Sequence, residues 1–304
     1  MTRIVYEAEG KQSELIDANN RTVLRCIYDL HGKAAYQDGM DSGERRMLHD
    51  AFGQPIRSWN ERGEAGRTVY DALRRPVESY VRGADGSEIL VGRIVYGEAF
   101  EDAAQRNWIG RTAQTFDQAG IVTNEEYDFK GNLLYGSRRL AREYKRMLDW
   151  SGDVPLEERV YGSRTRYDAL NRPTEMVAPD GSVIRQTYCE AGLLRSVEAR
   201  LREQPSSKAK SDWTSFVRRV EHDAKGRRTK IEYGNGAVTR YTYDPLTFRL
   251  THLETRRETT RYPEDCPQPP SPGWPGCGLQ QLRYTYDAAG NIVRIRDGAQ
   301  QTVF

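Results

Sequence analysis

The stretch YDALNRPTEMVAPDGS at residues 167–182 has a near-copy, YDALRRPVESYVRGADGS, at residues 70–87. Each copy opens on a Tyr–Asp pair and closes on Asp-Gly-Ser. Turn signals that recur about every ten residues, with short segments between them, are typical of successive β-hairpins. The duplication therefore indicates a structural unit that the chain repeats, and not an active site that is present twice.

This unit recurs with a period of about 21 residues. Aspartates that follow an aromatic residue or a histidine mark it, and the steps 29→50, 50→71 and 223→244 are each 21 residues long. Cys189 takes the aspartate position 21 residues after Asp168. The period predicts an all-β fold of consecutive antiparallel β-hairpins, about 14 units in one segment over residues 1–304. The residues assigned to the repeat motif are Tyr28, Asp29, Asp50, Tyr70, Asp71, Phe116, Asp117, Tyr127, Asp128, Tyr167, Asp168, Tyr188, Asp223, Tyr243, Asp244, Tyr286 and Asp287.

The hydrogen bonds and backbone geometry of β-turns explain most of the residue types in this motif. In DLHG (29–32), DAFG (50–53), DQAG (117–120) and DAKG (223–226), Asp opens and Gly closes a four-residue block. Type I turns prefer Asp at the first position, where its carboxylate accepts a backbone N–H two residues on, and Gly at the fourth. Arg74 closes the block DALR (71–74), and the sequence offers no reason for it. The flanking RYTYD segments (240–244 and 283–287) place Tyr241 with Tyr243, and Tyr284 with Tyr286, on one strand face.

The segments YDALNRP…PDGS…YCEAG (167–192), YDFKGNLL (127–134) and YTYDAAGNIVRIRD (284–297) resemble the YD repeats of RHS-repeat proteins. Over about residues 26–304 the order of units is most similar to the B-type subunits of bacterial insecticidal toxin complexes. The resemblance implies a ribbon coiled as part of a hollow shell that encloses a toxin cargo. It also implies other RHS-shell segments or toxin-complex subunits as partners, and a secreted or extracellular location. Shells of that family are longer, so we expect a fragment of a shell, a split gene product or a piece that another chain completes. We also expect the isolated chain to be aggregation-prone or to need a partner.

Three stretches interrupt the repeat. Residues 97–110 and 137–150 carry apolar side chains at helical spacing, which predicts two short helical inserts against the sheet. Partner docking is the alternative role for these inserts. The stretch 262–278 contains six prolines and is predicted to be a protruding loop. Trp274 in that loop could form a recognition surface, although a packed surface loop is the favoured interpretation.

Composition excludes several classes of protein. The 46 basic and 44 acidic residues are mixed along the chain, which gives no basic footprint for nucleic acid. No apolar run is long enough to cross a membrane as a helix, and the first residues lack the apolar core of a classical signal peptide. The hydrophobic share of 37% suits sheets that are wetted on one face. Cys26 and Cys189 are expected as free thiols, and Cys266 and Cys277 could pair under oxidising conditions.

Catalytic templates are not matched: the chain has no GxSxG, Walker A, HExxH or EF-hand sequence. His49 and His222 occupy the aromatic position before an aspartate, which favours a role in the repeat over general-base chemistry. No cofactor or metal site is predicted, and calcium at acidic turns is a minor alternative. We therefore predict a non-catalytic structural segment and not an enzyme. The rival hypothesis is a carbohydrate- or cell-surface-binding module, in which glycan binding would depend on Tyr241 and Tyr284.

Overall fold

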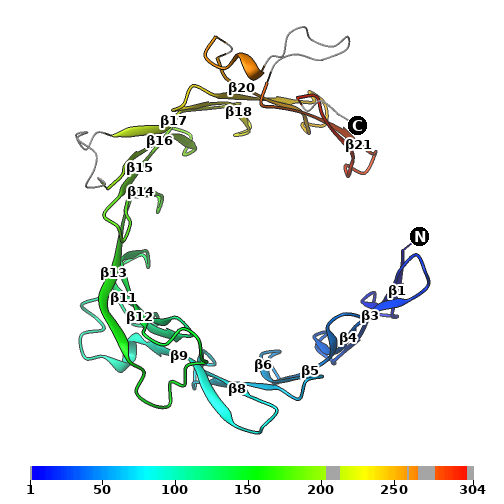
Figure 1. The fold of residues 1–304 in the computed structure, drawn as a ribbon, viewed down its shortest axis with the longest axis vertical. Coiled ribbons are helices and arrows are strands. Elements are labelled where there is room, and N and C mark those ends of the chain that lie inside the picture. Colours follow the sequence, from blue (N-terminus) through cyan, green and yellow to red (C-terminus); the bar gives the residue numbers. More distant parts are fainter. Residues whose placement is uncertain (1, 203–212, 259, 266–277, 300–304) are drawn as a thin grey trace. The chain divides into compact units, whose positions relative to one another are not determined.

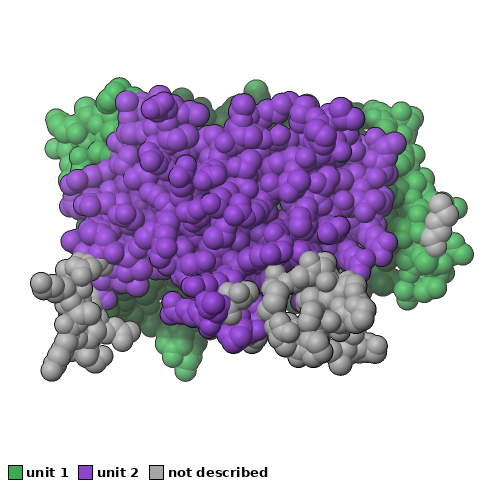
Figure 2. Space-filling model, turned by 90° about the horizontal axis from the view of Figure 1, so that it is seen from above, with its two compact units in different colours: residues 1–162 green, residues 163–304 purple. Residues whose placement is uncertain are grey.

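The computed structural model describes residues 2–202, 213–258, 260–265 and 278–299. In these residues the protein is all-β: 22 strands follow one another, and neighbouring strands pair antiparallel. The all-β prediction is confirmed. The chain divides into two compact units, residues 1–162 and 163–304, which Figure 2 colours green and purple. Whether the repeat forms one segment stays a prediction.

The strands of unit 1 are β1 (Arg3–Tyr6), β2 (Gln12–Ile16), β3 (Thr22–Tyr28), β4 (Ala34–Gly39), β5 (Gly43–His49), β6 (Pro55–Asn60), β7 (Ala65–Tyr70), β8 (Pro76–Arg82), β9 (Glu88–Tyr96), β10 (Thr112–Asp117), β11 (Gly120–Tyr127) and β12 (Leu133–Ala141). β13 (Leu156–Tyr167) crosses the boundary between the units. Unit 2 continues with β14 (Pro173–Val177), β15 (Val183–Tyr188), β16 (Leu194–Arg200), β17 (Thr214–His222), β18 (Arg228–Tyr233), β19 (Val238–Tyr243), β20 (Leu250–Arg256), β21 (Gln280–Tyr286) and β22 (Ile292–Asp297). Two single 3-10 turns, η1 (Gly97–Ala99) and η2 (Pro263–Asp265), complete the described structure.

Each unit is a single-layered ribbon of hairpins, as the run of strands in Figure 1 shows. Alternation along the strands produces one covered face: in β19, Thr239, Tyr241 and Tyr243 are covered whereas Arg240 and Thr242 are exposed. Such a ribbon buries little. The accessible surface of the whole chain is 20780 Å², whereas a compact monomer of this mass has roughly 13,000 Å². The low apolar content therefore suits a fold without a thick core.

Antiparallel pairing places alternate turns at opposite edges of the ribbon. Turns that follow odd-numbered strands form what we call the odd row, and turns that follow even-numbered strands form the even row. In unit 1 the odd row consists of residues 7–10, 29–32, 50–53, 71–74, 97–111 and 128–131. In unit 2 it consists of residues 168–171, 189–192, 223–226, 244–248 and 287–290.

The predicted helical insert at 97–110 is wrong, because only η1 forms at its start and the rest consists of turns. The N–H of Gly97 donates to the carbonyl of Arg111 at 2.9 Å, so the segment is an enlarged odd-row turn. Its apolar residues pack into a cluster in which Trp108 is 3% exposed and meets Phe100 edge to face. Asn107 and Gly110 have positive φ, which a continuous helix does not allow. Tertiary packing therefore explains the apolar spacing.

The predicted helical insert at 137–150 is also wrong. Ser137 lies in β12 and pairs with Thr123 of β11, because the ladder satisfies the backbone groups of this stretch. Residues 142–155 form a loop without a helix. Leu148 and Trp150 of this loop are buried against Leu90 in the second apolar cluster of unit 1.

The remaining expectations concern the loops and thiols. Cys26 and Cys189 are free, as predicted. Cys266, Cys277 and Trp274 lie outside the described residues, as does most of the proline-rich stretch 262–278. Among the described residues, no helix has the length and apolar character needed to span a membrane.

Candidate functional site: the odd row of Tyr–Asp turns

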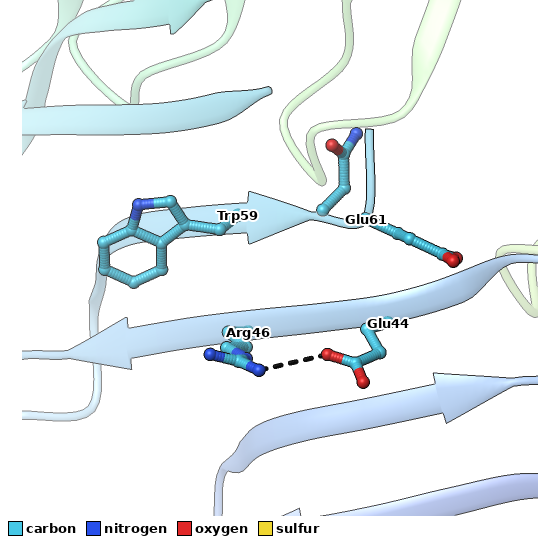
Figure 3. Close-up of a pocket in the computed structure, with 5 residues that line it drawn as sticks. Glu44, Arg46, Trp59 and Glu61 are labelled. Atoms are coloured by element: carbon cyan, nitrogen blue, oxygen red, sulfur yellow. Dashed lines mark hydrogen bonds and ion pairs between the residues drawn. The ribbon is translucent and has the colours of Figure 1, made fainter. Parts of the chain in front are cut away.

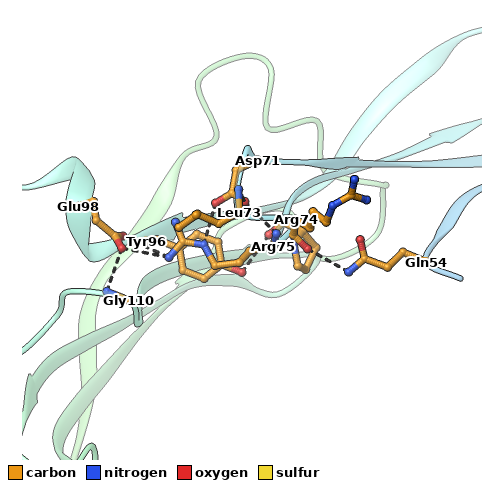
Figure 4. Close-up of polar contacts among 9 residues, drawn as sticks. Gln54, Asp71, Leu73, Arg74, Arg75, Tyr96, Glu98 and Gly110 are labelled. Carbon is orange, nitrogen blue, oxygen red and sulfur yellow. Dashed lines mark hydrogen bonds and ion pairs between the residues drawn. The ribbon is translucent and has the colours of Figure 1, made fainter. Parts of the chain in front are cut away.

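The turn at Asp71 shows the geometry of the repeat (Figure 4). The N–H of Asp71 donates to the carbonyl of Arg75, and the N–H of Arg74 donates to the carbonyl of Asp71, both at 2.9 Å. Oδ1 of Asp71 accepts the N–H groups of Leu73 and Arg75 at 2.9 and 2.8 Å. One carboxylate oxygen therefore closes the turn from inside. The same four bonds form at Asp29, Asp50, Asp168 and Asp223.

These bonds explain the charge state of the aspartates. The N–H of Lys33 is the main cause that lowers the pKa of Asp29, and the N–H of Gln54 does the same for Asp50. Hydrogen bonds to a carboxylate favour its ionised form. The lowered pKa of Asp29 and of Asp50 therefore favours the charged carboxylate in the turn that it stabilises.

A second carboxylate oxygen binds the residue four positions later. Arg172 Nε donates to Asp168 Oδ2 at 2.7 Å, and Arg227 Nε donates to Asp223 Oδ2 at the same distance. Arg75 makes the equivalent bond to Asp71 and also reaches Glu98 at 3.1 Å. This bond orients each guanidinium along the odd row.

The oriented guanidinium then covers the tyrosine of the next odd-row turn. The centre of the Arg227 guanidinium lies 4.3 Å from the ring centre of Tyr243, and that of Arg172 lies 4.4 Å from the ring centre of Tyr188. Arg227 Nη1 also donates to the carbonyl of Phe248 in the next turn, at 3.0 Å. A cation above an aromatic face is attracted by the ring quadrupole. Each of these two turns thus contacts the turn that follows it.

The tyrosine hydroxyl makes a contact in the reverse direction. It donates to the carbonyl of the first residue of the preceding even-numbered strand. Tyr188 binds Pro173 and Tyr243 binds Arg228, both at 2.8 Å. The same bond forms from Tyr28 to Gln12, Tyr70 to Pro55, Tyr96 to Pro76, Tyr127 to Thr112 and Tyr286 to Leu250. We call the aspartate, the residue four positions later and the next tyrosine an inter-hairpin clamp.

Arg74, which the sequence leaves unexplained, has a place in the row. Its φ of 62° replaces the usual glycine in the left-handed region. Its guanidinium centre lies 3.4 Å from the ring centre of Phe52, and its Nη1 lies 3.2 Å from Asp50 Oδ2. Gln54 donates to the carbonyl of Arg74 at 3.0 Å. Contacts with the preceding turn therefore stabilise the unfavourable backbone.

Most of the predicted motif residues lie in the odd row, but Phe116 and Asp117 do not. Asp117 pairs directly with Gly120 across a two-residue loop, and its Oδ1 accepts the N–H of Ala119 at 2.8 Å, so the predicted Asp-to-Gly turn forms, but in the even row. Phe116 instead meets Trp150 edge to face, at 5.0 Å between ring centres. The block DQAG has the same residue pattern as the odd-row turns, but it connects β10 to β11 at the opposite edge of the ribbon.

Two substitutions in the repeat behave as the sequence suggests. Cys189 takes the aspartate position: its N–H donates to the carbonyl of Leu193 at 2.8 Å. His49 stands in the aromatic position, and its Nδ1 lies 3.1 Å from Oδ2 of Asp29 in the preceding odd-row turn. His49 therefore links two turns by a side-chain hydrogen bond from its ring, where a tyrosine would use its hydroxyl.

Sequence reasoning missed two parts of the row. Tyr96 and Gly97 begin the enlarged turn, and Arg111 closes it and lies over Tyr127 at 5.3 Å. The missed signal is the basic or amide residue that recurs four positions after the aspartate. It occurs as Lys33, Gln54, Arg75, Asn132, Arg172, Arg227 and Asn291.

The surface also contains a shallow hollow of about 450 Å³ lined by Glu44, Arg46, Trp59, Asn60 and Glu61 (Figure 3). Arg46 and Glu44 form an ion pair of 3.1 Å in it. Among the described residues, no group of three histidines, cysteines or acids is placed to hold a metal ion. The repeated geometry of this fold therefore lies in the odd row and not in this hollow.

Comparisons with known proteins point to toxin complexes. The chain is 25% identical to toxin subunit YenC2 of Yersinia entomophaga over 98% of its own length, and 25% identical to toxin subunit YenC1 of the same organism over 95%. It spans about a third of the length of these curated relatives, 32% and 28%. No family model matches the sequence.

Solved structures show the same fold. The crystal structure of TcdB2-TccC3-Cdc42 matches 99% of this chain with a TM-score of 0.74 and 24% identity, over 14% of its own chain. The Photorhabdus luminescens Tc holotoxin pore matches 99% with a TM-score of 0.75 and 24% identity, again over 14% of its own chain. The chain is thus similar over nearly its whole length to parts of larger toxin-complex proteins.

Proposed function

We propose that the chain is a non-catalytic wall segment of an RHS-type toxin complex, whose ribbon helps to enclose and deliver a toxic cargo. The inter-hairpin clamp carries this proposal. It repeats in both units, and in unit 2 Tyr188 and Tyr243 each bind a carbonyl 15 residues earlier. In such a ribbon each hairpin contacts only the neighbouring hairpins, so hairpins can be added without a limit on length. The product is an extended sheet, which is suited to form a wall.

The reactive side chains of the odd row support a structural role. The carboxylate of Asp223 is occupied by two backbone N–H groups and by Arg227, which in turn covers Tyr243. A general base or nucleophile has to meet a substrate, whereas these groups meet each other. The similarity to two toxin subunits along 98% and 95% of the chain supplies the biological setting.

The partners in this proposal are other shell segments or toxin-complex subunits, together with the enclosed cargo. The proposed location is extracellular, as part of the assembled complex. The carbohydrate-binding alternative is less well supported. In the row, tyrosine hydroxyls are bonded to backbone carbonyls and ring faces are covered by cations, as Tyr188 with Pro173 and Arg172 illustrates.

The test is affinity purification of the tagged full chain from the bacterium that produces it, from both cells and culture medium. We expect toxin-complex subunits to co-purify, and a cargo segment within the complex to resist added protease. Loosening a clamp with Tyr243→Phe together with Arg227→Met should expose the cargo, whereas Arg240→Met on the exposed side of β19 should not. Purification without any toxin-complex subunit, or cargo that is digested equally in all samples, would contradict the wall function.

A further inference from the structure

The tips of the odd row in unit 1 carry large apolar side chains in solvent. Five consecutive turns after the first each present one: Leu30 is 104% exposed, Phe52 68%, Leu73 69%, Ile109 63% and Phe129 79%. Single exposed apolar residues are ordinary on protein surfaces, but a contiguous set marks an interaction site. We call these five residues the apolar tip row.

The turn geometry does not require these residues. The even-row turns of the same unit at 17–20, 60–63, 83–86 and 117–120 present no large apolar residue at their tips, whereas Met40, 49% exposed in the turn 39–42, and Tyr144 and Met147 of the loop 142–155 are exceptions. Central turn positions normally favour small or polar residues. The odd edge therefore differs from the even edge in carrying an exposed apolar side chain at five consecutive turns.

The charge of the odd row points to the nature of its partner. The five odd-row blocks that carry the apolar tips, 29–33, 50–54, 71–75, 97–111 and 128–132, hold seven acids and six bases, a net charge of −1. Surfaces that bind anionic membranes are rich in Lys and Arg. A nearly neutral edge with apolar tips instead suits another protein edge of the same kind.

The spacing of the tips further restricts the kind of partner that fits the apolar tip row. Successive odd-row turns are separated by two strands, or about 9.6 Å at the usual strand spacing. A second ribbon of the same repeat has this spacing by construction. Leu73 is the third of the five tips and so lies at the centre of the row. A two-fold axis close to Leu73 would place the row of a second copy antiparallel to the first, with each tip of one row between two tips of the other row. Such a contact is self-complementary and closed.

We propose that the apolar tip row is a self-association surface, at which a second copy of this chain docks row against row in opposite directions. The inference goes beyond the wall function and does not depend on it. Phe52 is held for this contact, because Arg74 packs 3.4 Å from one face of its ring. Docking would remove from water the side chains that the ribbon by itself leaves exposed.

The test is sedimentation velocity on the purified full chain over concentrations up to about 100 µM. We expect a monomer–dimer equilibrium for the native chain. Leu73→Glu should weaken the dimer by about thirty-fold or more, because it places a charge at the centre of an apolar contact. The matched control is Ala84→Glu, at an exposed even-row tip of the neighbouring turn, which should leave the equilibrium unchanged.

Circular dichroism melting of each variant checks folding, and Phe52→Ser serves as a second tip variant that adds no charge. A native chain that stays monomeric throughout, or a dimer that Leu73→Glu and Phe52→Ser leave intact, would overturn the proposal. So would co-flotation with phosphatidylcholine–phosphatidylserine vesicles that requires Leu73 while no dimer forms. Failure of dimerisation would leave the wall function, which is tested by co-purification, unaffected.

Discussion

Replacing Tyr243 by Phe removes one half of a single inter-hairpin clamp and leaves the ring in place. The lost atom is the hydroxyl that donates to the carbonyl of Arg228 at 2.8 Å. The Arg227 guanidinium, 4.3 Å from the ring centre, keeps its aromatic partner. The change therefore isolates the backward contact between hairpins.

The expected cost is about 1 kcal/mol, the usual net value of one hydrogen bond in a protein. Since 1.4 kcal/mol corresponds to a factor of ten, the equilibrium for local opening should shift roughly five-fold toward the open form. The effect should stay near the altered hairpin, because repeat units contact only their neighbours. Global unfolding is a poor readout, since long repeat arrays lose two-state behaviour.

Native-state hydrogen exchange by mass spectrometry measures this opening. We expect roughly five-fold faster exchange in peptides that cover residues 223–233, with no change in peptides from residues 34–60. The matched control is Tyr284→Phe, another half-covered strand tyrosine, whose hydroxyl makes no hydrogen bond with a described residue. The clamp model is refuted if Tyr243→Phe and Tyr284→Phe exchange alike, or if exchange increases equally across the whole chain.

Other predictions test the turn, the loop and the charge of the row. Gly192→Ala should cost about 1–2 kcal/mol of backbone strain, and it should accelerate hydrogen exchange around its turn more than Gly181→Ala accelerates exchange around its own turn, because only Gly192 lies against Arg172, whose Nη1 would be 3.2 Å from the new Cβ. Trp150→Ala should cost about 3–5 kcal/mol locally, seen as faster hydrogen exchange in peptides that cover Leu90 and the loop 142–155, whereas Tyr144→Ala in the same loop should have little effect, because that side chain is 82% exposed. The pKa of Asp29 and of Asp50 is lowered by folding, so their stabilisation is complete above the ordinary aspartate pKa of about 4 and is lost as the pH falls through the lower folded value. Exchange of the odd-row amides, corrected for intrinsic rates, should therefore accelerate below about pH 4, and Asp50→Asn should flatten that dependence in the turn 50–54.

Local signals were sufficient to predict the hairpins and their turns, but not the edge of the ribbon at which each turn lies. Asp29, Asp71 and Asp223 form the predicted turns, because the necessary hydrogen bonds lie within four residues of each aspartate. DQAG has equivalent local chemistry, yet it belongs to the even row, since strand pairing decides which edge a turn occupies. The edge depends on whether an odd or an even number of strands precedes the turn, and the turn motif carries no information about that number.

The two expected helices failed for a related reason. Apolar spacing around Trp108 and Leu148 resembles an amphipathic helix, although both residues are buried from irregular loops. Periodicity reports which side chains are buried and does not report the backbone that carries them. The long-range partners, such as Leu90 for the loop of Trp150, are known only once the strands are paired.

The sequence by itself determined the all-β repeat, its turn chemistry and the free state of Cys26 and Cys189, because these depend on neighbouring residues or on composition. The tertiary structure alone decided that Arg227 covers Tyr243 and that Tyr243 binds the carbonyl of Arg228. It also decided that the apolar tips gather at one edge. These contacts join residues that lie 15 or more positions apart, and only the antiparallel register of the strands brings them within a few ångströms.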